Sequence, residues 1–250
     1  MNGRHFYFRI FTLCVVFVLV TSCAHRSGHG KKQSDNRRTT LNERFEQQLR
    51  KEKPVVEHPD NQNKMEGSEI FRKYGEAVFI IVTSNGKELH QGSGFFIGSD
   101  GLAVSNYHVF NGTGKDGGVV KLAGDDNVYK IAQVYAKSEE EDFILFRIEC
   151  DNQVYLPIAT SRPQVGDKVF AIGSPLGLEN TFSSGEVSQW RDQYLMQISA
   201  QIDHGSSGGA LVNEYGEVVG ITSGTFAEGS QANLNYAWSI DVVKPYLKEK

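Results

Sequence analysis

Three residue types that together perform nucleophilic catalysis occur in order along the chain: His108, Asp142 and Ser207. Ser207 lies in a glycine-rich run, 203–211, that leads into an apolar segment. A serine hydroxyl is a poor nucleophile unless an adjacent base activates it and a third group orients that base. Glycines allow a tight backbone fold in which the N–H groups of Gly205 and Ser207 converge on a developing oxyanion. The pattern therefore predicts acyl-transfer chemistry at a serine.

Each of these positions also has a simpler interpretation. A lone histidine such as His108 is more often a buried structural residue than a catalytic base. Asp142 directly precedes an apolar run, so its carboxylate is expected to be shielded and aimed at an imidazole. The glutamates at 139–141 are expected to stay in water. Ser206 is a second serine in the same loop and competes with Ser207 for the role of nucleophile.

Short apolar runs separated by turn residues predict two successive sets of β-strands. Asp100-Gly101 is the strongest hairpin signal in the chain. A short helical run is expected from Glu69, and Asp241 is expected to cap a short closing helix. The regular strand spacing is typical of an all-β barrel or sandwich. The predicted strands cover 77–83, 94–97, 102–104, 119–122, 128–134 and 143–148, then 168–172, 186–188, 195–200, 210–212, 218–222 and 235–240.

The composition is that of a globular protein. Of 250 residues, 39% are hydrophobic and 22% are charged, which excludes a disordered, collagen-like or coiled-coil chain. The 26 glycines together with many aromatic residues favour turn-rich β structure. The formal net charge is −4, and the acidic excess lies after residue 66. An acidic body argues against nucleic acid as a partner.

The amino terminus reads as an export signal. Residues 1–22 combine a basic start with an apolar stretch that is too short to span a bilayer. Val20-Thr-Ser-Cys23 resembles a bacterial lipobox, which implies cleavage before Cys23 and lipid attachment to that cysteine; an ordinary signal peptide with a chance cysteine is the alternative. Residues 23–66 are polar and are expected to form a tether.

Several further segments, taken in order, resemble the trypsin-like serine peptidases and most closely their HtrA/Deg (Do-like) branch. The resemblance runs from about residue 70 to 247, with the histidine, aspartate and serine in the expected order. One matching segment would be a weak signal, but a series of them is strong. The matching segments are 92–97, 100–101, 105–108, 142–145, 166–177, 184–188 and 205–211.

This resemblance implies an all-β fold of two six-stranded antiparallel β-barrels, with a short C-terminal helix and an active site in the cleft between the barrels. The protease domain would occupy 67–250, with the first barrel at about 77–150 and the second at about 160–240. No PDZ domain is expected beside it.

The resemblance also assigns the site residues. It makes Ser207 the nucleophile, His108 the general base and acid, and Asp142 the orienting carboxylate, with the N–H groups of Gly205 and Ser207 as the oxyanion hole. It implies no metal and no cofactor. Rough alignment with the branch places five residues in the substrate pocket, where we expect a small or medium apolar side chain: Gln201, Ile202, Thr222, Ser223 and Gly224.

The sequence departs from the branch at two positions of the serine loop. Ser206 stands where these enzymes usually have asparagine or aspartate, and His204 stands where they commonly have proline. Both changes affect the loop that must form the oxyanion hole.

The function expected from all of these features is that of a lipid-anchored serine endopeptidase of the bacterial cell envelope. Its partners would be protein or peptide substrates, the membrane and other copies of the chain in a homotrimer. The outer membrane is the expected location in a Gram-negative source. The alternative is a catalytically silent, peptide-binding pseudo-protease or chaperone of the same fold.

Overall fold

The computed structural model describes residues 63–113, 118–150, 154–174, 180–225 and 234–247. The predicted signal peptide at 1–22, with Cys23, and most of the predicted tether at 23–66 lie outside the described residues. None of the helices in the described ranges has the length and apolar composition needed to cross a bilayer.

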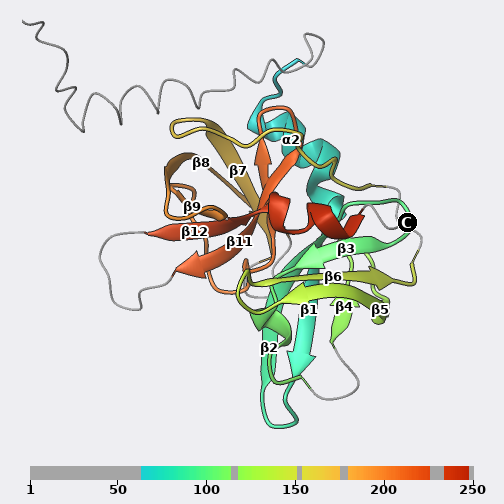
Figure 1. Ribbon diagram of the computed structural model, residues 1–250. Helices are drawn as coiled ribbons and strands as arrows, with labels where there is room; N and C mark the ends of the chain where they lie inside the picture. Colours follow the sequence, from blue (N-terminus) through green and yellow to red (C-terminus); the bar gives the residue numbers. More distant parts are fainter. Residues whose placement is uncertain (1–62, 114–117, 151–153, 175–179, 226–233, 248–250) are drawn as a thin grey trace, which may run out of the picture. The chain divides into compact units, whose positions relative to one another are not determined.

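Two closed antiparallel β-barrels of six strands each make up the described body, so the predicted fold class is confirmed (Figure 1). The first barrel has the strand order β1-β2-β3-β6-β5-β4 and closes through pairing of β1 with β4. Its strands are β1 (Val78–Ser84), β2 (Leu89–Phe96), β3 (Leu102–Ser105), β4 (Val119–Lys121), β5 (Val128–Ser138) and β6 (Phe143–Ile148).

The second barrel repeats the topology of the first. Its order is β7-β8-β9-β12-β11-β10, and pairing of β7 with β10 closes it. Closure leaves neither sheet with an unpaired edge. The strands are β7 (Lys168–Gly173), β8 (Thr181–Trp190), β9 (Leu195–Ile198), β10 (Ala210–Asn213), β11 (Val218–Thr225) and β12 (Asn235–Ser239).

Three apolar cores hold the body together, one inside each barrel and one that combines residues of both. In β6 the side chains alternate, because Phe143 and Leu145 join the shared core whereas Ile144 and Phe146 point into the first barrel. Both faces of the strand are therefore buried, which explains why its sequence is a continuous apolar run.

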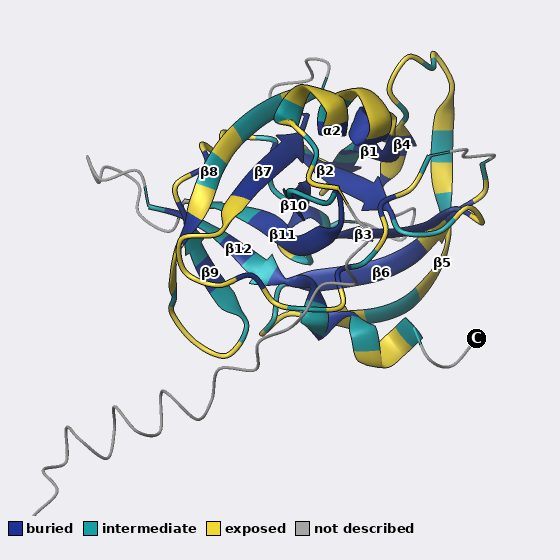
Figure 2. Cartoon of the chain, turned by 90° about the horizontal axis from the view of Figure 1, so that it is seen from above, coloured by how far each residue is buried: buried dark blue, intermediate teal, exposed yellow. Residues whose placement is uncertain are grey.

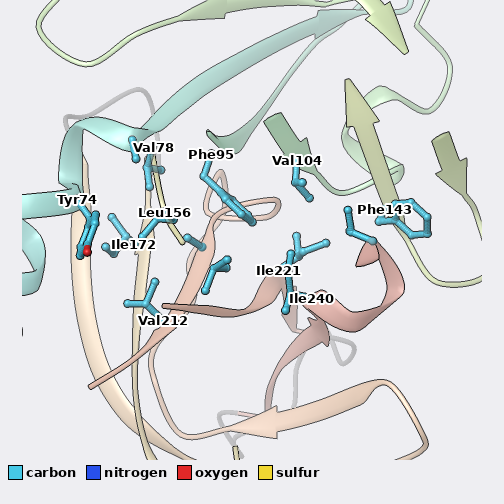
Figure 3. Close-up of a cluster of buried hydrophobic side chains, with 14 of the residues drawn as sticks. Tyr74, Val78, Phe95, Val104, Phe143, Leu156, Ile172, Val212, Ile221 and Ile240 are labelled. Atoms are coloured by element: carbon cyan, nitrogen blue, oxygen red, sulfur yellow. The ribbon is translucent and has the colours of Figure 1, made fainter. Parts of the chain in front are cut away.

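The shared core brings together residues that lie far apart in the sequence. Figure 3 shows Val78, Phe95 and Val104 of the first barrel beside Ile172 and Ile221 of the second. All five are buried. Figure 2 shows the same arrangement as dark blue strands in the middle of the molecule, with exposed residues on the outer strands and helix α2.

The link between the barrels is hydrogen-bonded to both of them. Leu156 N donates to Phe96 O at 2.9 Å, and Ala159 N donates to Val218 O at 3.0 Å. Leu156 is fully buried in the shared core. The link therefore fixes one barrel against the other.

The helical elements are short. Helix α2 (Gly67–Tyr74) buries Ile70 and Tyr74 in the shared core and continues into the 3-10 turn η1 (Gly75–Ala77). The expected closing helix is present as two 3-10 turns, η4 (Ile240–Val242) and η5 (Lys244–Leu247). Its cap is Ser239, whose hydroxyl accepts a hydrogen bond from Asp241 N at 3.3 Å.

Strand lengths differ most from expectation at β2, β5 and β8. Strand β5 continues to Ser138, beyond the predicted end at 134, because its last residues pair with β6. Strand β2 begins at Leu89, five residues before the apolar run, because it continues the β1 register out to Ser84. Strand β8 covers 181–190 rather than 186–188. Its first half has a single apolar side chain, that of Phe182, and no fully buried residue, so pairing with β7 decides its conformation instead of a hydrophobic pattern.

Asp241 joins the C-terminal turns to the second barrel. Its carboxylate accepts hydrogen bonds from Arg162 and from Lys244, the latter at 2.6 Å. Partial burial opposes ionisation of Asp241, but the hydrogen bonds from Lys244 and Arg162 outweigh it and hold the pKa of this carboxyl below its usual value.

We expect Asp241→Asn to lower the free energy of unfolding at pH 7 by about 1 kcal/mol. A lowered folded-state pKa gives stability that is present above the unfolded pKa and lost as the pH falls through the folded pKa. The difference in free energy of unfolding between wild type and variant should therefore disappear in acid. Urea unfolding at several pH values measures it, with the exposed Asp126→Asn as a control. A difference that stays constant down to pH ~3 would contradict this role.

Candidate active site

His108 is the first residue of a 3-10 turn that follows β3. This turn, η2 (His108–Phe110), is anchored by Val109, which is buried in the core of the first barrel. The carbonyl of Val109 also accepts a hydrogen bond from Thr83 Oγ1 at 2.9 Å. Because Val109 faces inward, the neighbouring imidazole of His108 is left on the surface, with its side chain 46% exposed.

Asp142 precedes β6 and receives hydrogen bonds from both barrels. Its Oδ1 accepts from His108 N at 2.9 Å, and its Oδ2 lies 2.8 Å from His108 Nδ1. The same Oδ2 accepts from Ser223 Oγ, in β11 of the second barrel, at 2.8 Å. An ionised carboxylate only accepts hydrogen bonds, so Nδ1 carries the hydrogen and Nε2 of the neutral imidazole keeps its lone pair.

The backbone of Asp142 adopts an unusual conformation. Its φ is +45°, and no other residue except glycine has a positive φ in the described part of the chain. Asn106 holds it there, because Asn106 Nδ2 donates to Asp142 O at 2.8 Å. Left-handed backbone outside glycine costs about 1 kcal/mol, so these hydrogen bonds stabilise a strained position.

The loop that carries Ser207 is fixed through its carbonyl groups. Ser93 Oγ donates to Gly205 O at 2.7 Å, and Ser93 N donates to Ser207 O at 2.7 Å. Thr222 Oγ1 donates to Ser206 O at 2.8 Å. Ser93 lies in the first barrel and Thr222 in the second, so both barrels hold this loop.

The amides of Gly205 and Ser207 have no partner within the described residues, and neither do those of Asp203 and His204 at the start of the loop. Asp203 to Ser206 form a β-turn in which Ser206 N donates to Asp203 O at 2.9 Å. Gly205 occupies the third position of this turn at φ +94°, as a type II turn requires. The turn thus leaves two N–H groups, of Gly205 and Ser207, able to donate to an oxyanion.

Ser207 and His108 line the same open cavity, which has a volume of about 430 Å³. No hydrogen bond joins Ser207 Oγ to the imidazole among the residues that the structure describes. Such contacts are often long without substrate and tighten in the complex. The geometry therefore brings the predicted nucleophile and the predicted base to one cavity without a direct hydrogen bond between them.

Four of the five predicted pocket residues line this cavity: Gln201, Ile202, Ser223 and Gly224. The fifth, Thr222, does not. Its side chain is buried, donates to Ser206 O and lines a separate cavity of about 100 Å³. In this structure Thr222 stabilises the serine loop through its hydrogen bond to Ser206 O and does not contact the cavity of Ser207.

Asn106 and Asn235 belong to the site but were not assigned a role from the sequence. Asn106 lies two residues before His108, and only the contact with Asp142 distinguishes it from an ordinary polar residue. Asn235 lines the cavity, and its place in the sequence, at the start of a strand 28 residues after Ser207, carries no signal of its own.

Comparison with known families identifies a peptidase domain. The model of the trypsin-like peptidase domain matches residues 92–221 of this chain, which is about half of its length. The chain belongs to the trypsin-like peptidase family. The matched region includes His108, Asp142 and Ser207, and the two barrels agree with the fold expected of this peptidase.

Relatives of this trypsin-like peptidase include proteins of the HtrA/Deg branch. A probable periplasmic serine endoprotease, DegP-like, from Rhizobium meliloti is 33% identical over 175 residues, covering 64% of this chain and 34% of the relative. Anti-sigma-I factor RsgI9 of Acetivibrio thermocellus is 32% identical over 191 residues, covering 73% of this chain and 26% of the relative. The chain therefore spans only about a quarter to a third of the length of these relatives.

A solved structure supports the fold. The crystal structure of the serine endoprotease from Yersinia pestis has a TM-score of 0.65 with this peptidase at 24% identity. The match covers 75% of this chain and 67% of the Yersinia protein.

The left-handed backbone of Asp142 predicts an unusual order of stability among variants. Asp142→Ala and Asp142→Gly lose the same side-chain hydrogen bonds, but only alanine is strained at φ +45°. We expect the glycine variant to be the more stable by up to about 1 kcal/mol in urea unfolding.

The control for this order is Glu141, whose φ is not positive. There the alanine variant should be at least as stable as the glycine variant. If the alanine variant is at least as stable as the glycine variant at both positions, the backbone of Asp142 is not strained in solution.

Proposed function

We propose that this trypsin-like peptidase is a serine endopeptidase that cleaves peptide bonds through an acyl-enzyme. The observation that carries the proposal is the Asp142 carboxylate, which accepts from His108 of one barrel and Ser223 of the other. An imidazole oriented in this way presents Nε2 to the cavity that Ser207 lines.

In the proposed reaction, Ser207 Oγ attacks the carbonyl carbon of the scissile peptide while His108 Nε2 takes the hydroxyl proton. Asp142 stays ionised and stabilises the imidazolium. The N–H groups of Gly205 and Ser207 donate to the oxyanion of the tetrahedral intermediate. His108 then gives its proton to the leaving amine, and the same steps with water in place of Ser207 release the acid.

The second part of the proposal concerns location. The relative from Rhizobium meliloti is named a periplasmic endoprotease, and the leader of this chain resembles that of a bacterial lipoprotein. We therefore place the peptidase in the cell envelope, anchored through a lipid on Cys23, where exposed segments of exported proteins are its substrates. A homotrimer is the proposed assembly.

The decisive experiment for the chemistry is labelling of the full-length protein with a fluorophosphonate probe. Wild type should be labelled, whereas Ser207→Ala should show no labelling because it removes the attacking oxygen. His108→Ala should slow labelling by at least a hundredfold, because general-base catalysis contributes about 10²–10⁴.

Ser206→Ala is the matched control, because it removes the neighbouring hydroxyl and should retain labelling. A folded wild-type protein that does not react would contradict the proposed enzyme. That outcome would favour a peptide-binding protein that has the barrels without turnover.

The anchor predicts a separate result. Cys23→Ala should move the protein from the membrane fraction to the soluble fraction, since no thiol remains at that position to carry the lipid. Cys14→Ala is the control within the leader and should leave fractionation unchanged. Equal partitioning of the two variants would exclude lipidation at Cys23.

A further inference from the structure

Asn235 is the one residue of β12 that lines the cavity of Ser207. It is the first residue of that strand, and it pairs with Ile198 of β9 on one side and with Thr225 of β11 on the other. Only 2% of its surface is exposed. A carboxamide is therefore held at a buried position of the cavity by a closed sheet.

The amide nitrogen of this carboxamide is hydrogen-bonded within the second barrel. Asn235 Nδ2 donates to Ala200 O at 2.8 Å, which fixes the orientation of the amide because Oδ1 must point away from that carbonyl. Asn235 Oδ1 accepts no hydrogen bond from any described residue. The only buried side-chain atoms without a partner in the described residues are Asn106 Oδ1 and Trp238 Nε1, so Asn235 Oδ1 remains accessible from the cavity. A bound group that covers this oxygen must donate a hydrogen bond to it or leave it unpaired, which is costly.

The other groups around the cavity are consistent with a neutral, polar ligand. Gln201 adds a second carboxamide, whose side chain makes no hydrogen bond within the described part of the chain. Ile202 is buried and provides an apolar wall. No lysine or arginine lines the cavity among the described residues, and its only carboxylate is that of the exposed Asp203.

We propose that Asn235 makes this peptidase select substrates by a neutral hydrogen-bond donor in the side chain that precedes the cleaved bond, in place of the small or medium apolar side chain expected from the sequence. Glutamine, asparagine, threonine and serine have such a donor. This inference rests on the proposed function, because attack by Ser207 on a carbonyl carbon places the preceding side chain in the adjoining cavity.

Other classes of substrate side chain leave a hydrogen-bond acceptor or a charge without a partner in the pocket. An aliphatic side chain would cover Asn235 Oδ1 without pairing it, which should cost a factor of about 10 to 100. A substrate carboxylate would place its oxygen, which only accepts hydrogen bonds, against the acceptor Asn235 Oδ1. A lysine could donate to the amide oxygen, but its charge would be buried without a partner carboxylate at that depth.

Peptidyl phosphonate probes test this selectivity without a known substrate. Two pairs of probes have side chains of similar size that differ in chemistry: threonine is compared with valine, and asparagine with leucine. The measurement is the second-order rate constant for labelling Ser207 in the full-length protein. We expect the donor-bearing member of each pair to react at least tenfold faster.

Asn235→Ala should reduce each ratio to about one or reverse it, because the unpaired oxygen is gone. The matched control is Gln193→Ala, which removes an exposed amide from the turn before β9 and should leave both ratios unchanged. If the alanine variant does not fold, the wild-type ratios alone decide the question.

A simple fluorophosphonate without a peptide separates the two levels of the proposal. If this probe labels the protein and the valine and leucine probes react as fast as or faster than the threonine and asparagine probes, the proposed selectivity is wrong but the proposed enzyme activity is supported. No labelling of a folded protein by any probe would overturn both.

Discussion

The apolar core shared by the two barrels is the constraint on which the site depends, because His108 and Asp142 belong to the first barrel and Ser207 and Ser223 to the second. A shift of one barrel against the other would separate His108, the proposed base, from Ser207, the proposed nucleophile. Phe95 and Ile221 are fully buried within this core, and Leu156 of the link packs in it as well. A tightly packed core resists sliding, since small displacements open voids.

The polar contacts of the site reinforce the same interface. Ser93 of the first barrel bonds two carbonyls of the serine loop, and Asp142 accepts from Ser223 across the cleft. These bonds use the carbonyl groups of the loop and leave the amides of Gly205 and Ser207 without protein partners. In the proposed reaction, a loop held in this way is oriented for the oxyanion before substrate arrives, which is the arrangement that lowers the reorganisation energy.

This arrangement also bears on the two loop positions at which the sequence departs from the HtrA/Deg branch. Ser206 is buried and held through Thr222 and Asp203, so a serine is accommodated in the turn. His204 is exposed at the cavity, and its side chain makes no hydrogen bond with another described residue. The type II turn at Gly205 is compatible with both residues, because the glycine provides the positive φ.

The sequence by itself determined the fold class, the family and the order of His108, Asp142 and Ser207, because strand patterns and short motifs are local properties. It also located nine of the twelve strands closely, but the strands predicted for β2, β5 and β8 were too short, since their ends lie outside the apolar runs and form by pairing with neighbouring strands. The roles of the site residues stay predictions until the labelling experiments are done. Tertiary structure alone decided that Thr222 stabilises the serine loop through Ser206 O, that Asn106 holds the strained backbone of Asp142, and that Asn235 presents a buried amide to the cavity. These three depend on contacts across 16, 36 and 35 positions of the chain, and no local pattern encodes such contacts.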